Sequence, residues 1–287
     1  MFKSPIKIAL SGLALILAAV FLYLAVNSYS MDSMIAKEVE TLIQDSQQAA
    51  PHTFTYADLE GLPAPVQRYF RYSLPEGQPT IAYAKVTIES EFKSPAFSNF
   101  GVFNATEHLL GTRPGLIFDA VMYPFPVVWM DLRDKYYNGH AAMQINMFSG
   151  YNSMTETNIP ELDMTTLIRW AGEIVLMPTA LLPSDTIQWE AVDDNTAIAV
   201  ITDGGRTGRI RFTFNEQGQI VSYTSDDRFD RIDNVYQPSA SLTYRSGYQT
   251  IDGITIPTEF RVLKIQNGVQ DEYFRGKVVD IEFVTVK

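Results

Sequence analysis

The sequence predicts a mainly β protein: a single curved antiparallel sheet of about ten strands, forming a partly closed barrel with covering helices and preceded by an N-terminal transmembrane helix. Three observations predict it. A long apolar run, Ile8–Val26, stands near the N-terminus. From Thr80 onward, apolar and polar residues alternate with a period of two, which is typical of half-buried strands. Turn-forming pairs such as Asp252-Gly253 separate consecutive runs, which favours an antiparallel meander over a parallel sheet.

The run Ile8–Val26 is long enough to cross a bilayer, since its 19 residues make a helix of about 28 Å. A cleaved signal peptide has a shorter apolar region that ends in small residues, whereas this run leaves through Leu24–Tyr29. We therefore expect an uncleaved anchor; a cleaved signal and a buried helix are the alternatives. Lys3 and Lys7 precede the run and Asp32 follows it. This order predicts a cytoplasmic N-terminus, one pass through the inner or cytoplasmic membrane, and a periplasmic or extracellular body.

The chain is expected to divide into three parts. Residues 1–30 form a cytoplasmic tail and the anchor, residues 31–57 a stalk helix and linker, and residues 58–287 a β-rich extracytoplasmic domain. Ser33–Gln48 carries an apolar stripe at helical spacing, with Asp32 or Ser33 as its N-cap. A separate stalk or external helix is therefore expected to begin there.

Strands are expected wherever the period of two is sustained. The first is residues 80–92, where Ala82, Ala84 and Val86 alternate with polar residues. The other expected strands are Phe100–Leu109, Leu116–Tyr123, Val127–Tyr137, Ala141–Phe148, Ile187–Ala191, Ala197–Thr202, Arg209–Phe214, Gln219–Ser225, Ser241–Thr250, Ile254–Leu263, Gln270–Val278 and Val279–Phe283.

Two helical segments are available to cover the apolar face of such a sheet. Asp58–Leu74 is one, and Glu161–Leu176 is the other, with Asp163 as a plausible N-cap and Pro178 ending it. The apolar stretch Met177–Pro183 cannot be regular and is expected to be a covered loop at the end of the sheet.

Several stretches resemble one known family of bacterial proteins. The most specific is the proline-rich Met177–Pro183, followed by Trp189–Asp194; Met177 stands where the family pattern has an aromatic residue. The others are Leu62–Tyr69, Thr202–Gly205 and Tyr273–Glu282. From Leu62 to the C-terminus, the chain resembles a family of uncharacterised, membrane-anchored proteins known as a domain of unknown function. The family implies no activity and no catalytic residues. The predicted architecture of the chain is similar to the periplasmic lipoprotein-carrier half-barrel. This is a similarity of fold, and a fold alone does not determine a function.

Composition and spacing exclude several classes of function. With 22 basic and 33 acidic residues, the net charge is −11, which disfavours nucleic-acid binding. The absence of cysteine excludes thiol catalysis and thiolate metal sites. The three histidines, His52, His108 and His140, are too widely spaced for a zinc motif, so no metal and no cofactor are expected. The aspartates between Asp226 and Asp233 lack the EF-hand pattern and indicate a solvated loop.

One acidic residue is a weak candidate for catalysis. Glu173 lies beside Trp170 on a predicted covering helix; if it is buried, its pKa would rise, as suits a general acid in a hydrolase. The favoured alternative is that Glu173 faces solvent or pairs with Arg169, four residues earlier.

Large apolar side chains suggest where a ligand would bind. They belong either to a filled core or to an apolar cavity, and the candidate ligand-binding residues are Trp129, Met143, Trp170, Met177 and Trp189. The leading hypothesis is a membrane-anchored extracytoplasmic binding module for a lipid-like or apolar ligand, attached to the membrane through Ile8–Val26. The alternatives are an assembly partner of another envelope protein, of unknown identity, and the carboxylate hydrolase.

Overall fold

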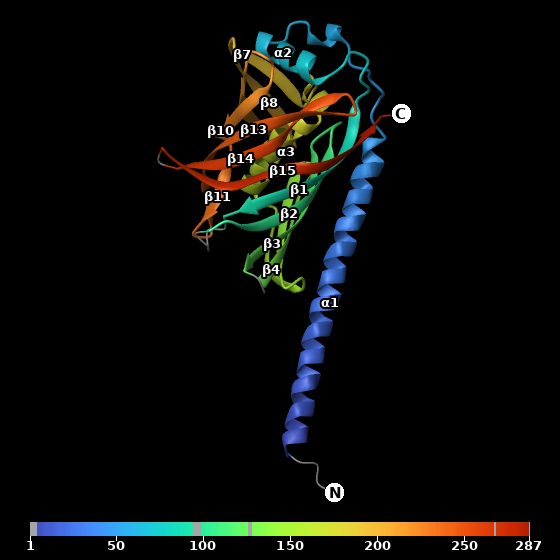
Figure 1. Ribbon diagram of the computed structural model, residues 1–287, viewed down its shortest axis with the longest axis vertical. Coiled ribbons are helices and arrows are strands. Elements are labelled where there is room, and N and C mark those ends of the chain that lie inside the picture. Colours follow the sequence, from blue (N-terminus) through green and yellow to red (C-terminus); the bar gives the residue numbers. More distant parts are fainter. Residues whose placement is uncertain (1–4, 94–98, 126–127, 267, 287) are drawn as a thin grey trace.

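The computed structural model describes residues 5–93, 99–125, 128–266 and 268–286, so Lys3, one of the two lysines behind the predicted orientation, lies outside the described residues (Figure 1). The helices are α1 (Pro5–Ser46), α2 (Ala64–Ser73) and α3 (Pro160–Glu173), with short 3-10 turns at Tyr56–Leu59, Ile174–Leu176 and Pro178–Leu181. The strands are β1 (Ile81–Phe92), β2 (Gly101–Leu110), β3 (Gly115–Phe125), β4 (Val128–Tyr137), β5 (His140–Met147), β6 (Tyr151–Thr157), β7 (Ile187–Asp193), β8 (Thr196–Asp203), β9 (Arg206–Phe214), β10 (Ile220–Ser225), β11 (Phe229–Ile232), β12 (Val235–Pro238), β13 (Ala240–Ile251), β14 (Ile254–Gln266) and β15 (Val269–Thr285).

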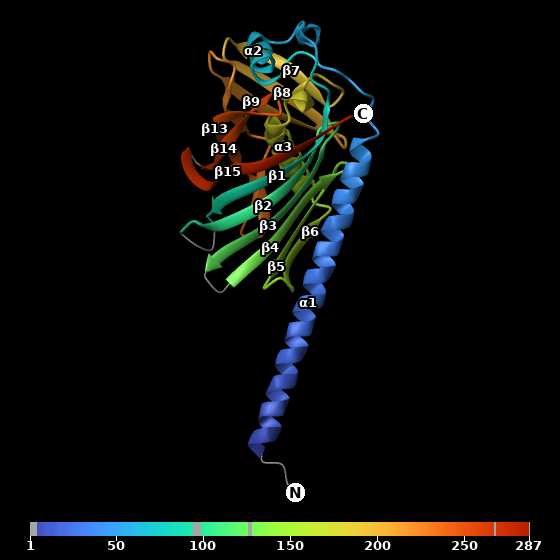
Figure 2. The same cartoon turned by 45° about the vertical axis from the view of Figure 1, so that its right-hand side comes forward.

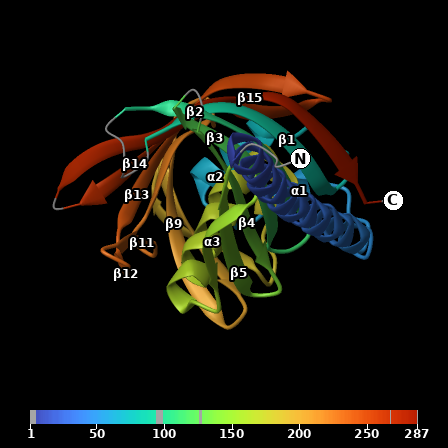
Figure 3. The same cartoon turned by 90° about the horizontal axis from the view of Figure 1, so that it is seen from below.

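One antiparallel sheet dominates the fold, as predicted. Its order is β6-β5-β4-β3-β2-β1-β15-β14-β13-β10-β9-β8-β7, and β11 and β12 form a separate hairpin. The pairing of β1 with β15 brings the last strand beside the first, so the chain closes its meander in the middle of the sheet. Figure 3, seen from the N-terminal end of α1, shows the sheet curving around α3 without closing, because β6 and β7 remain its two edges.

Among the described residues the sheet has 13 strands rather than about ten. Tyr151–Thr157 is an unexpected strand, since its polar sequence lies at an edge and gives no apolar alternation. The segment expected as a solvated loop after Asp226 contains the hairpin β11–β12. The two strands expected at the C-terminus are one strand, β15. Its side-chain alternation changes phase at a bulge, where the partners of Thr87 and Ile88 skip Val279.

Helix α3 lies inside the curve of the sheet and contacts β4, β5 and β9 (Figures 2 and 3). It buries Leu167, Ile168 and Ala171 against the inward side chains of the strands. The prediction that Asp163 caps this helix is wrong: Ile159 is the N-cap, Pro160 opens the helix, and the Asp163 side chain is only 2% exposed. Helix α2 covers the end of the half-barrel beside β8 and β14.

Helix α1 is continuous from Pro5 to Ser46. The expectation that a separate helix begins at Asp32 or Ser33 is therefore wrong. The segment between the apolar run and the stalk contains no proline or glycine, and nothing there stops helical hydrogen bonding. The C-terminal half of α1 packs on the outer face of the sheet. Met31, Ile35 and Leu42 are buried there against Leu110 and Ile117.

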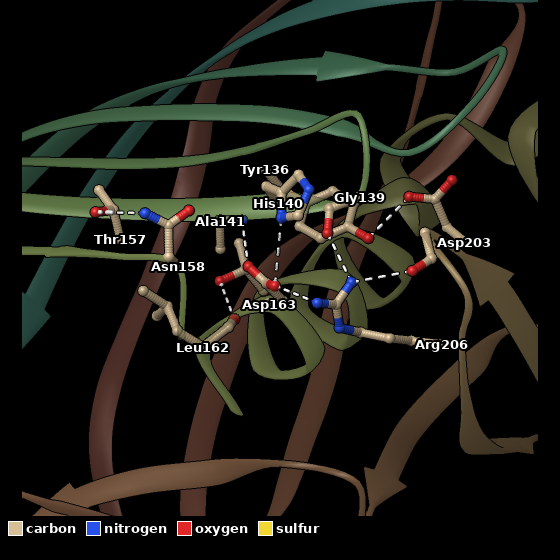
Figure 4. A network of polar contacts seen from close by, with 12 residues as sticks. Tyr136, Gly139, His140, Ala141, Thr157, Asn158, Leu162, Asp163, Asp203 and Arg206 are labelled. Atoms are coloured by element: carbon tan, nitrogen blue, oxygen red, sulfur yellow. Dashed lines mark hydrogen bonds and ion pairs between the residues drawn. The ribbon is translucent and has the colours of Figure 1, made fainter. Parts of the chain in front are cut away.

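A cluster of polar contacts joins the two halves of the open sheet (Figure 4). Asp163 of α3 pairs with Arg206 and accepts a hydrogen bond from the Ala141 backbone N–H at 2.6 Å. Arg206, at the start of β9, also donates to the Gly139 carbonyl at 2.8 Å. In the same place the turns β4–β5 and β8–β9 touch, because a Cβ on Gly139 would lie 2.8 Å from the Cα of Gly204. The half-barrel is thus fastened by side chains and turns where strand pairing stops.

Candidate functional site

A cavity of about 270 Å³ lies between α3 and the inner face of the sheet. It is partly open and draws its walls from both halves of the half-barrel and from the hairpin β11–β12. The apolar lining residues are Phe92, Phe103, Phe118, Leu132, Met143, Leu162, Ile168, Phe229, Val262 and Phe274. The charged lining residues are Asp134, Arg169, Glu173, Arg228, Asp230, Arg231 and Lys264.

The apolar wall of the cavity is formed by side chains that the strand pleat directs toward the inner face of the sheet. Phe103 and Phe118 occupy inward positions on β2 and β3, and their rings stack with centroids 5.8 Å apart. Phe274 of β15 meets the Phe103 ring edge-on at 5.6 Å, and Phe92 of β1 lies 5.4 Å from Phe103. These side chains fix one another, so the aromatic wall is pre-formed.

Charged side chains from α3 and the strands meet at the same inner face. The Arg169 guanidinium donates to Glu107 Oε1 at 3.1 Å and to Asp134 Oδ2 at 2.8 Å, and it lies 4.1 Å from the centre of the Phe118 ring. Glu107 is fully buried on β2, and its second oxygen, Oε2, has no hydrogen-bond partner among the described residues. Arg169 therefore ties α3 to two strands at once.

A second ion pair lies beside the first. Arg245 of β13 has a side chain that is only 1% exposed; it donates to Glu173 Oε2 at 2.7 Å and to the Tyr223 hydroxyl at 3.0 Å. Glu173 is therefore partly buried and paired with Arg245, rather than solvent-facing or paired with Arg169 as the favoured alternative held. The carboxylate of Glu173, the candidate general acid, is thus already engaged in an ion pair with the Arg245 guanidinium.

Three carboxylates face two arginines in this cluster: Glu107 and Asp134 pair with Arg169, and Glu173 pairs with Arg245. Burial raises the pKa of Glu107 to about 8, and the nearby Glu173 carboxylate adds to this, against the lowering effect of Arg169. Burial likewise raises the pKa of Asp134. Burial and the surplus carboxylate thus both favour the protonated form of Glu107.

The five residues predicted to bind a ligand are spread over the molecule. Met143 of β5 lines the cavity. Trp170 is buried on α3 and donates to the Leu110 carbonyl at 3.0 Å, and Met177 is fully buried after it. Trp189 donates to the Leu181 carbonyl at 2.9 Å near α2, and Trp129 donates to Ser149 Oγ at 2.7 Å in the β5–β6 turn. These four lie away from the cavity walls.

Sequence reasoning missed Glu107 and Arg245, the two most buried charges of the site. The period of two carried a signal for Glu107, which stands at the inward position between Ala105 and Leu109. It carried none for Arg245, which is buried on β13 in phase with the polar residues Ser241 and Thr243. A charge in the apolar phase of a strand indicates a buried partner, but the partner itself comes from another element far along the chain.

Each of the three histidines contacts a different partner. His52 contacts Asp58, His140 lies 3.6 Å from Asp163, and the His108 Nδ1 lies 2.6 Å from the Tyr83 hydroxyl on the outer face. Within the described ranges, no group of three histidine, aspartate or glutamate side chains is placed to hold a metal ion.

The fold and its cavity define a class: an open antiparallel half-barrel that encloses a helix and a small apolar chamber. The chain belongs to a family of unknown function, DUF6920, whose model matches residues 60–283. The resemblance noted in the sequence is thereby confirmed. Comparison with the curated proteins finds no match.

Several solved structures are similar at low identity. A putative outer membrane lipoprotein-sorting protein domain from Vibrio parahaemolyticus aligns with a TM-score of 0.39 and 9% identity over 70% of this chain and 85% of its own. A LolA superfamily protein from Nitrosomonas europaea gives 0.41 and 8% over 78% and 93%. A DUF1329 family protein from Desulfovibrio piger gives 0.41 and 12% over 76% and 90%.

Proposed function

We propose that this protein is a membrane-anchored, extracytoplasmic binding module for a lipid-like or apolar ligand. The cavity of about 270 Å³ between α3 and the inner face of the sheet carries the proposal. Ligand pockets are typically about 300–1,000 Å³, so this chamber is near the lower limit and suits one acyl chain or a similarly slim apolar group. A bulky headgroup would stay at the opening.

The proposed location rests on α1. Its N-terminal half has a mean hydropathy of 2.5 over an 18-residue window and no buried residue in that window, which supports insertion of Ile8–Val26 as an anchor. Under this proposal residues 1–30 are the tail and anchor, and the β body lies outside the cytoplasm. The part from Met31 to Ser46 is a packed external helix of that body.

The polar residues of the cavity indicate which end of a ligand would face them. Lys264 pairs with Asp230 at 3.0 Å, and Arg231 pairs with Glu156 at 2.7 Å, both beside the hairpin β11–β12. Arg228 adds a third cation to this wall. An amphiphile with its chain against Phe103 and Phe118 would therefore place a polar or anionic group near the hairpin.

The test uses the full chain purified in detergent. We expect native mass spectrometry to detect a co-purified lipid, and cis-parinaric acid to gain fluorescence on binding. Met143→Trp fills the cavity and should abolish both signals, whereas Val192→Trp, at an exposed site on β7, should leave them unchanged. Leu132→Phe provides a milder second filling if Met143→Trp does not fold. Absence of bound lipid and of probe binding in the folded wild type would refute the proposal.

A further inference from the structure

We propose that four aromatic side chains at one end of the half-barrel are immersed in the interface of the same membrane that α1 crosses. We call them the aromatic rim: Tyr123, Trp129, Phe148 and Tyr151. The proposal rests on the anchor role given to α1 above, and it adds a second contact between the body and the bilayer. That contact would hold the open end of the half-barrel against the lipid surface.

The depth of the rim follows from where α1 meets the sheet. A Cβ on Gly150, in the turn between β5 and β6, would collide with the Cα and carbonyl oxygen of Leu24. The turn therefore touches the helix backbone two residues before Val26, the end of the apolar run. At 1.5 Å per residue this is about 3 Å inside the expected end of the span. Because α1 is one continuous helix, this level is fixed relative to the span.

The contact face of α1 begins at that same level. Leu24, Ser28, Met31, Ile35, Glu38 and Leu42 are partly or fully buried at alternating intervals of four and three residues, the spacing of one helical face. Figures 1 and 2 both show α1 lying along the sheet and leaving it at the lower end of the half-barrel, where the β5–β6 turn meets the helix. The lower end of the sheet and the emerging end of the span thus lie side by side.

The rim carries the residue types that favour a membrane interface. The side chains of Tyr123, Phe148 and Tyr151 are 46%, 37% and 55% exposed, which is costly in water for such large rings. Trp129 packs edge-to-face on Phe148 with ring centroids 5.5 Å apart, and its indole N–H is already used by Ser149. Tyrosine and tryptophan are enriched where hydrocarbon meets headgroups.

Electrostatic attraction does not explain the contact. The chain has a net charge of −11, and Asp131 and Asp119 lie on the outer face near the rim, so anionic lipid would be repelled. Aromatic insertion does not require positive charge, which fits this acidic protein. The partner surface we infer is therefore the bilayer interface itself, with little dependence on lipid charge or salt.

The test places single spin labels on the full chain in liposomes. The sequence contains no cysteine, so Tyr151→Cys and Phe148→Cys give unique labelling sites. We expect both labels to be severalfold less accessible to water-soluble nickel chelate, and more accessible to oxygen, than a label at Val192→Cys on β7. Tyr123→Cys is the alternative if either variant misfolds. Liposomes of neutral phosphatidylcholine, with and without phosphatidylglycerol, should give the same depths.

Ala25→Cys, within the apolar run, separates the two proposals. If Ala25→Cys is oxygen-accessible and shielded from nickel while Tyr151→Cys and Phe148→Cys behave like Val192→Cys, the span is correct and the rim proposal is overturned. If the Ala25→Cys label is itself water-accessible, the anchor assignment fails and the rim proposal fails with it. Shielding at all three sites, with Val192→Cys fully exposed, supports the rim.

Discussion

Arg206 at the start of β9 forms an ion pair with Asp163 inside α3, and the Asp163 side chain is only 2% exposed. The same guanidinium donates to the Gly139 carbonyl at 2.8 Å, so one side chain connects the covering helix to both halves of the open sheet (Figure 4). The residue that looked like a helix cap is therefore a fastening point of the barrel.

Asp163→Asn should destabilise the body strongly. Removing one partner of a buried ion pair leaves the other charge uncompensated, and this costs about 3–5 kcal/mol; the lower value applies because Arg206 is partly exposed. Urea unfolding followed by tryptophan fluorescence measures the change. Glu190→Gln is the control, since Glu190 and Arg209 form a half-exposed pair that solvent screens, so its loss should change stability far less. Equal losses in the two variants would contradict the fastening role.

Gly139→Ala should destabilise the same region through backbone contact. Gly139 has φ +80°, and an added Cβ would lie 2.8 Å from the Cα of Gly204. Gly205→Ala is the matched control: its φ is +74°, but a Cβ there meets no atom within 4 Å. The control therefore carries only the cost of a left-handed backbone, about 1 kcal/mol, and Gly139→Ala should have the lower melting temperature. Identical melting temperatures would show that the two turns do not press together.

Glu107→Gln should flatten the dependence of stability on pH. Burial raises the pKa of Glu107 from 4.5 to about 8. Between these values the native state retains a proton that the unfolded state releases, so this residue's contribution to the unfolding free energy falls as pH rises. Melting temperatures of the wild type should decline across this range more steeply than those of Glu107→Gln. Glu89→Gln, at a half-exposed pair with Lys277, should retain the wild-type slope.

Glu38→Gln should loosen α1 from the sheet. Glu38 pairs with Lys135 at 2.9 Å and with Arg133, whose side chain is 6% exposed. Burial raises the pKa of Glu38, but the two cations outweigh it and the net pKa is lowered. The pair therefore stabilises at neutral pH, and its contribution is lost as pH falls through the lowered pKa. Hydrogen exchange over residues 31–46 should accelerate in Glu38→Gln and stay unchanged in Glu40→Gln, whose side chain is exposed.

Local patterns predicted the strands well because alternation and turn residues are written in adjacent positions. The bulge at Val279 split one strand into two, since a single extra residue reverses the phase of the pattern. Polar edge strands such as Tyr151–Thr157 gave no signal. The cavity depends on contacts between Arg169 and two strands some 35 and 62 residues away in sequence, and periodicity does not encode such pairings.

Under the proposed anchoring and binding function, the unbroken helix α1 also limits how the body would meet a ligand. A body on a flexible tether sweeps a volume above the membrane, whereas one fixed to a straight rod moves only as the rod drifts and tilts. Encounters then depend on two-dimensional diffusion, and a ligand delivered from afar has to reach the membrane surface before this protein can take it.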